Sequence, residues 1–195
     1  EMLPETLSRQ KNKQVYESYD KFVLAVSKGY HKQYPRNALQ RNLGNTFYEV
    51  GRQLGLSATE WSWAALLFDM DNDGYKDVYI SNGIYKDLLD RDYLTYYAND
   101  EQISQILRSG KEVITDLIDL MPSKAVTNAV FRNNGDFTFS DKRSDWGLNQ
   151  PSFSNGSAYG DLDNDGDLDL VVNNVNSEAF IFENHSEVEN NHFLS

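Results

Sequence analysis

Two short acidic segments of the chain share one pattern of side chains. Residues 69–77 and 161–169 both read D-x-D-N-D-G-x-x-D. Carboxylates this close together in a compact loop repel one another unless a cation lies among them. Oxygen-only ligands select a hard cation such as Ca²⁺, and glycine at the sixth position allows the sharp turn around the ion. The pattern therefore predicts two calcium ions, one in each loop.

The expected ligands occupy the same positions in both loops. Positions 1, 3, 5 and 9 offer side-chain oxygens, and position 7 offers its backbone carbonyl, so its residue type can vary. A solvated turn would explain one degenerate copy of this pattern, but two complete copies favour a bound cation. The predicted ligands are Asp69, Asp71, Asp73, Asp77 and the carbonyl of Tyr75 in the first loop, and Asp161, Asp163, Asp165, Asp169 and the carbonyl of Asp167 in the second.

The EF-hand is a different calcium-binding loop whose first half fits the same pattern. Its loop ends in a bidentate Glu at position 12 and lies between two helices. Here position 12 is Ile80 in one loop and Val172 in the other. Both loops continue into segments rich in apolar and β-branched residues, which favour strands. We therefore expect strands, not helices, on either side of each loop.

The composition agrees with ion binding and excludes several other classes of protein. The 195 residues carry a net charge of -12 and include no cysteine. Lys and Arg form no cluster of the kind that nucleic acids or anionic membranes require, so we expect neither partner. Disulfides, zinc–thiolate sites and thiol catalysis are excluded. No apolar run approaches the roughly 20 residues of a transmembrane helix.

The acidic loops belong to a longer repeat. A segment that begins at Asn37 returns at Asn128, with an Arg-Asn-x-Gly turn, a Gly-Leu link and then the acidic loop. Each copy is predicted to run strand, turn, strand, link, strand, loop, strand, and we expect these strands to form one four-stranded antiparallel sheet. Repeated sheets of this kind stack on one another, as in the blades of a β-propeller.

The segment between the two copies has a helical pattern instead. Apolar residues at steps of three and four over residues 103–121 predict an amphipathic helix that ends at Pro122, and residues 85–98 form a second candidate helix. We expect this insert to cover one face of the sheets. The predicted division is a partly helical N-terminal segment that ends a preceding unit (1–36), a first blade (37–83), a helical insert (84–127), a second blade (128–184), and a tail or the start of a next element (185–195).

The sequence carries no catalytic constellation. The three histidines are scattered, and Gly156-Ser157 lacks the G-x-S-x-G pattern of a nucleophile elbow. Paired carboxylates occur only inside the acidic loops, where an ion would occupy them. The prediction is a non-catalytic protein; the alternative is an accessory part of a polysaccharide-active or other metal-dependent hydrolase or lyase. Five aromatic residues could stack on a sugar if exposed, although packing against sheets or insert is favoured: Trp61, Trp63, Trp146, Tyr96 and Tyr97.

These motifs resemble those of the calcium-binding FG-GAP/VCBS repeat proteins, whose distant relatives include the integrin alpha-chain propellers. The Arg-Asn-x-Gly turn, the Gly-Leu link, Trp61-Ser-Trp63-Ala-Ala and the segment 68–78 look like exported VCBS-repeat proteins of Bacteroidota-type bacteria, which an ASPIC/UnbV domain often follows. The resemblance covers most of residues 37–184. It implies a propeller fold, calcium in each intact loop, and a place outside the cell, at the cell surface or in the periplasm. The repeats, together with the lack of a catalytic constellation, predict a role in adhesion or in contact with glycans or proteins.

The chain departs from this family in two respects. It holds about two blades, whereas a closed propeller needs roughly four to eight, and it carries the helical insert. Either further blades lie in a longer parent protein, or chains associate with one another to complete a ring.

Overall fold

The computed structural model describes residues 2–13, 19–97, 99, 101, 103–104, 108 and 111–186, with residues 111–113 described by their backbone alone. The chain is mainly β, with antiparallel sheets and a few short helices, which confirms the predicted fold class. It divides into two compact units. The β unit comprises Glu1–Leu3, Arg36–Tyr85 and Ala125–Ser195, and the helical unit comprises Pro4–Pro35 and Lys86–Lys124.

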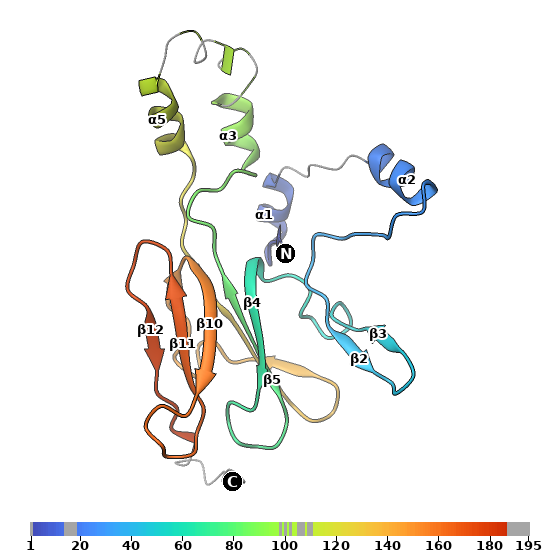
Figure 1. Cartoon of the computed structure of the whole chain (residues 1–195), viewed down its shortest axis with the longest axis vertical. Helices are drawn as coiled ribbons and strands as arrows, with labels where there is room; N and C mark the ends of the chain where they lie inside the picture. Colours follow the sequence, from blue (N-terminus) through green and yellow to red (C-terminus); the bar gives the residue numbers. More distant parts are fainter. Residues whose placement is uncertain are drawn as a thin grey trace. The chain divides into compact units, whose positions relative to one another are not determined.

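Two sheets make up most of the β unit, and neighbouring strands in both are antiparallel. The central strand β5 of the larger sheet is buried along its whole length. Figure 1 shows the strands of the smaller sheet side by side. The larger sheet has the order β1 (Met2–Leu3), β4 (Glu60–Phe68), β5 (Asp77–Asn82), β7 (Ala129–Asn133), β8 (Phe139–Asp141), and the smaller has β10 (Ser154–Gly160), β11 (Asp169–Asn174), β12 (Phe180–Phe182).

Two strand pairs lie outside these sheets. The hairpin of β2 (Gln40–Asn42) and β3 (Phe47–Glu49) is a two-stranded sheet, as is the pair of β6 (Val126–Thr127) with β9 (Pro151–Ser152). The expectation that the four strands of one repeat pair with one another is therefore wrong. Instead, β4 and β5 of the first repeat continue into β7 and β8 of the second.

The pairing of β5 with β7 explains this exchange between repeats. Val78, Tyr79 and Ile80 lie opposite Phe131, Val130 and Ala129, so apolar residues meet on both faces of the sheet. Tyr79 and Val130 are completely buried as a result. A pairing of β5 with the short, exposed β2 or β3 would leave these side chains uncovered, and burial of apolar area is the main term that favours one pairing over the other.

Apolar side chains also pack between the two large sheets. Phe68, at the end of β4, is buried, and its ring stacks on that of Tyr159 in β10 with the centroids 4.4 Å apart. The residues of this core come from both sheets and include Tyr79, Val130 and Val172. The smaller sheet therefore lies against the larger one, as neighbouring blades do in a stacked repeat.

The Gly-Leu links cover equivalent faces in the two repeats. Leu56 is buried in a cluster with Val78 and Ile80 of β5. Leu148, in the second link, packs against the cluster that contains Leu170 of β11. In both repeats, the leucine of the link packs against the apolar side chains of the strand that follows the acidic loop. The sequence repeat is therefore accompanied by a repeat in side-chain packing.

The helical unit joins the N-terminal segment to the insert. Asp87 lies 3.4 Å from the Arg9 guanidinium and 3.6 Å from the Lys13 ammonium, and Asn12 donates to Asp90 at 2.8 Å. Its helices are α1 (Leu7–Asn12), α2 (Tyr19–Ser27), α3 (Arg91–Tyr96) and α5 (Lys111–Leu120). The sequence did not predict this association, because nothing local to either segment marks the other as its partner.

The predicted helices agree with the structure in part. The helix expected over residues 85–98 begins only at Arg91, because Asp90 caps it by accepting from the Tyr93 amide at 2.9 Å. For the helix expected over 103–121, residues 105–107 and 109–110 lie outside the described residues. Coverage of the sheets by the insert stays a prediction. Among the described residues, no helix is both long and apolar enough to span a membrane.

Candidate metal centre

The two acidic loops connect antiparallel strands, β4 to β5 in one case and β10 to β11 in the other. The predicted strands on either side of each loop are thus confirmed for both copies. The backbone follows the same path twice. The fourth residue has a positive φ (54° at Asn72, 64° at Asn164), as does the sixth (90° at Gly74, 96° at Gly166). Asparagine and glycine are the residues that adopt this left-handed conformation at least cost.

Hydrogen bonds at the start of each loop repeat as well. The amide of Gly74 donates to Asp69 Oδ2 at 2.9 Å, and that of Gly166 donates to Asp161 Oδ2 at 3.2 Å. These bonds orient the first aspartate of each loop in the same way.

Carboxylate oxygens converge in both loops. One oxygen each from Asp69, Asp71 and Asp77 lies within 4.8 Å of the others, and the same holds in the second loop for a set of three. An ion about 2.3–2.6 Å from each oxygen spans such a separation, so the arrangement fits Ca²⁺. The set in the second loop is Asp161, Asp163 and Asp165.

Two predicted ligands stand outside these convergent groups. Asp73 accepts instead from the Arg132 guanidinium, whose Nη2 lies 2.7 Å from its Oδ2. Asp169 is buried, and its two oxygens accept from the amides of Leu162 and Asn184, both at 2.9 Å. The ligand roles of the two carbonyls, Tyr75 and Asp167, stay predictions, as does the ligand set as a whole.

The last aspartate of the first loop lies in a strongly perturbed environment. Asp77 is fully buried, and burial raises its carboxyl pKa to about 6. Hydrogen bonds from the amides of Asn133 and Met70 oppose this rise, whereas the charges of Asp71 and Asp73 add to it. Desolvation and the charges of Asp165 and Asp169 also raise the pKa of Asp163, although its side chain is exposed. Because a nearby divalent cation favours the charged form, an ion in the first loop would offset the cost of the buried charge on Asp77.

An asparagine on the next strand holds the end of the first loop. The backbone amide of Asn133, at the end of β7, donates to Asp77 Oδ1 at 2.8 Å, and its side-chain Nδ2 donates to the Lys76 carbonyl at 3.2 Å. These bonds fix the ninth position relative to the following strand. The sequence showed Asn133 only as part of the repeated Arg-Asn-x-Gly turn and gave it no role.

The second loop is held in the same way by Asn184. Its amide donates to Asp169 Oδ1 at 2.9 Å, and its Nδ2 donates to the Leu168 carbonyl at 3.2 Å. Asn184 follows β12 as Asn133 ends β7, so the two asparagines are structurally equivalent. The signal that could have found them is the recurrence of Phe-x-Asn, in Phe131-Arg132-Asn133 and in Phe182-Glu183-Asn184.

The two loops are also joined to each other. Asn72, in the first loop, donates through Nδ2 to Asp167 Oδ1 of the second at 2.5 Å and to Ser186 Oγ at 3.0 Å. Asn184 donates in turn to the Met70 carbonyl of the first loop at 2.8 Å. Both loops therefore form one polar network at the same edge of the packed sheets, and order in one is coupled to order in the other.

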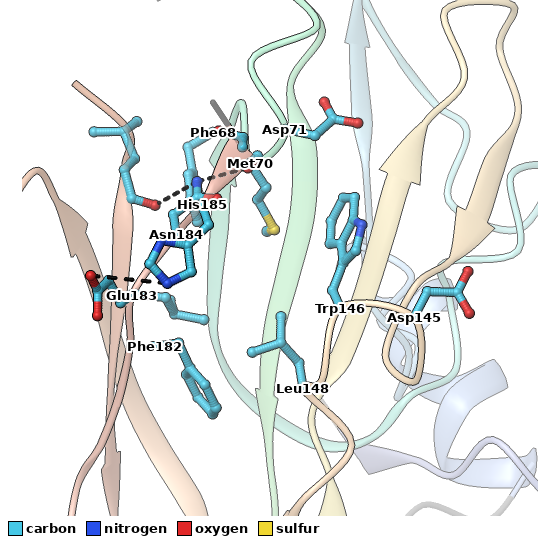
Figure 2. A pocket seen from close by; sticks show the side chains of 13 residues that line it. Phe68, Met70, Asp71, Asp145, Trp146, Leu148, Phe182, Glu183, Asn184 and His185 are labelled. Carbon is cyan, nitrogen blue, oxygen red and sulfur yellow. Dashed lines mark hydrogen bonds and ion pairs between the residues drawn. The ribbon is translucent and has the colours of Figure 1, made fainter. Parts of the chain in front are cut away.

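A cavity of about 290 Å³ lies beside this network. Figure 2 shows Trp146 and Leu148 on one side of it and Met70 and Phe182 on the other. Acidic groups lie at its edge, among them Glu183, whose Oε1 is 4.0 Å from His185 Nε2. The cavity thus combines an apolar interior with a polar margin, a combination common in ligand sites.

The aromatic residues singled out in the sequence have different surroundings. Trp146 is partly buried and packs against the core, as predicted. Trp63 is 55% exposed, so the expected packing between sheets is wrong for this residue, although its Nε1 donates to the Gly83 carbonyl at 2.6 Å. Trp61 stacks on it with centroids 6.3 Å apart. Tyr96 is exposed.

The second loop repeats the backbone path and the hydrogen bonds of the first. Residues 114–172 match the FG-GAP-like repeat. The match begins within α5, continues through β6 to β10 and ends in the middle of β11, so it contains the whole second loop. It is typical of a β-propeller-like repeat segment. No curated protein matches the chain. The finer resemblance to Bacteroidota-type proteins with an ASPIC/UnbV domain stays a prediction.

Proposed function

We propose that this chain is a non-catalytic, calcium-binding FG-GAP/VCBS repeat segment of an exported or cell-surface bacterial protein. It binds two Ca²⁺ ions, one per acidic loop, and mediates adhesion or contact with a glycan or another protein. The observation that carries the proposal is the convergence of three carboxylates in each of two loops with the same backbone path. The match of residues 114–172 supports the repeat class and, with it, a role in binding.

Calcium would act here as a structural cross-link. Each ion would tie the end of one strand to the start of the next, in a chain without cysteines to form disulfides. Calcium present at about 100 times its dissociation constant stabilises the folded state by roughly 2.7 kcal/mol. Extracellular calcium modules bind at about 0.1 to 1 mM, which suits a compartment outside the cytosol.

The cavity beside the loops is the candidate contact surface. The ring of Trp146 offers an apolar face, and the carboxylates of Asp145 and Glu183 offer hydrogen-bond acceptors for hydroxyl or amide groups. Both glycans and protein loops present this mixture of groups. Because the second loop precedes β11, which lines the cavity, bound calcium would also order the contact surface.

Calorimetric titration with Ca²⁺ tests the metal part of the proposal. We expect two ions per chain and a melting temperature that falls on chelation, since the folded state alone holds the ions. The double variant Asp71→Asn, Asp163→Asn should lose most of the binding. Asp116→Asn, which removes an exposed carboxylate from α5, is the control and should leave both quantities unchanged. An unchanged melting temperature on chelation of the wild type would remove calcium from the proposal.

A panel of immobilised glycans and of cell-surface proteins tests the contact part. Binding should require calcium and should weaken at least tenfold in Trp146→Ala, because a ring that lines the cavity is lost. Cleavage of any glycan in the panel would instead support the alternative, an accessory part of a polysaccharide-active or metal-dependent hydrolase or lyase.

A further inference from the structure

The two acidic loops differ in the charge of one residue that lies against them. In the first loop, Arg132 of β7 donates through Nη2 to Asp73 at 2.7 Å and through Nε to Asp71. The next residue along β7 is Asn133, which holds Asp77. Because that bond fixes the position of β7 beside the loop, the guanidinium is held against the acidic cluster by the pairing of the strands.

The equivalent residue at the second loop is Glu183. Asn184 makes the same two bonds to its loop that Asn133 makes to the first, so the residues that precede them occupy equivalent places. The Glu183 side chain is 62% exposed. Among the described residues, no lysine or arginine forms an ion pair with Asp161, Asp163 or Asp165.

The aspartates at the fifth loop position, Asp73 and Asp165, also differ between the two loops. In the second loop, Asp165 belongs to the convergent group of carboxylates. In the first, its counterpart Asp73 is absent from that group and is bound to Arg132 instead. A bound ion in the first loop would share Asp71 and Asp73 with the guanidinium and would lie close to a fixed positive charge, whereas in the second loop Glu183 adds negative charge.

We propose that Arg132 and Glu183 set unequal calcium affinities in the two loops, so that the second loop fills before the first. The inference rests on the proposed calcium binding and adds the order in which the sites load. Arg132 acts as a built-in cation that partly replaces the metal in the first loop. At low calcium the guanidinium therefore offsets part of the negative charge of the first loop, and this loop takes up an ion only at higher concentration.

Amide NMR spectra recorded during a calcium titration can follow each loop separately. The amides of Gly74 and Gly166 both donate to the first aspartate of their loop, so each reports on one site. In the wild type, we expect the Gly166 signal to shift at lower calcium than the Gly74 signal. The difference in midpoint should be on the order of tenfold or less, the size of one charge interaction that water screens.

Reciprocal variants test the assignment. Arg132→Gln should lower the Gly74 midpoint on the order of tenfold and leave Gly166 unchanged, whereas Glu183→Arg should raise the Gly166 midpoint by a similar factor. Arg41→Gln is the matched control, because Arg41 lies at the same point of the first repeat but stacks on Phe137, 3.8 Å from the ring centroid. It should change neither midpoint.

The opposite result has a clear physical meaning. Groups that orient metal ligands from outside commonly raise affinity. A higher Gly74 midpoint in Arg132→Gln would therefore make Arg132 an orienting residue and overturn the inference, as would equal midpoints in the wild type. Glu183→Arg, at an exposed position, keeps the test valid if Arg132→Gln fails to fold. A wild type that binds no calcium at all would instead overturn the proposed function together with the inference.

Discussion

At the scale of single residues, each acidic loop depends on an asparagine at or just beyond the end of a neighbouring strand, β7 or β12, as well as on its own aspartates. Asn133 and Asn184 each bond a buried aspartate and the carbonyl just before it. Such bonds from outside a metal site orient the groups that the metal binds. The first loop and β7, which carries Asn133, thus act together, although the whole helical insert separates Asp77 from Asn133 in the sequence.

Truncation of Asn133 should affect the first loop more than the second. Asn133→Ala removes the donor to the Lys76 carbonyl and should lower the free energy of unfolding by about 1 kcal/mol, the usual value for one hydrogen bond. Calcium should bind more weakly at the first loop, with the Gly74 amide shift as the readout. Asn134→Ala also removes side-chain hydrogen bonds, but these join Asn134 to Thr138 and Ser140 within its own turn. It is therefore the control for a loss of stability without a loss of calcium affinity, and an equal loss of calcium affinity in this variant would contradict the role of Asn133.

At the scale of elements, the sequence predicted strands better than it predicted their neighbours. Alternation and turn residues located β4, β5, β10 and β11 around the loops, because those signals are local. They did not predict that β5 pairs with β7, since alternation determines which face a side chain occupies but not which strand lies beside it. The role of Arg132 was missed for the same reason, because its partners lie in another repeat.

The Gly-Leu link should contribute strongly to stability. Leu56 is 3% exposed, and Leu56→Ala should cost about 2–5 kcal/mol through lost burial and a residual cavity. Leu67→Ala removes the same atoms from a side chain that is 46% exposed and should cost less than about 1 kcal/mol. Urea unfolding of the two variants makes the comparison, and equal midpoints would mean that the link does not cover the sheet.

Gly83, just after β5, should tolerate no side chain. Its φ is 134°, and a Cβ there would lie 2.8 Å from the Phe153 Cα, so Gly83→Ala would force two backbones apart. Gly147 has a φ of 70° but open space around it, so Gly147→Ala should cost only about 1–2 kcal/mol of left-handed strain. Thermal melting should rank Gly83→Ala clearly below Gly147→Ala, and the reverse order would contradict the close approach.

At the scale of the whole molecule, both acidic loops belong to the β unit, and the helical unit has its own ion pairs around Asp87. Calcium bound at the two proposed sites should therefore affect the two units unequally. The net charge of the chain is -12, and repulsion between negative charges opposes compact structure most strongly in the two acidic loops. Loss of calcium should therefore destabilise the β unit more than the helical unit.

Chelation of calcium should loosen the β unit first. We expect faster hydrogen exchange at the amides of Met70 and Leu162, which donate to the last aspartate of each loop, and in the strands that flank the loops. Exchange in α3 should change little. Mass spectrometry of peptides from protein with and without chelator makes this measurement, and uniform loss of protection over both units would contradict their independence.

The exchange of strands between successive repeats changes where the molecule can be divided. A recombinant fragment that covers residues 37–83 would retain β5 but lack β7, and would leave one side of Tyr79 bare to water. A fragment from β4 to β8 would carry a hydrogen-bonded set of four strands with an acidic loop and the asparagine that holds it. The structural unit, β4 to β8, is thus offset by half a repeat from the repeat that is visible in the sequence.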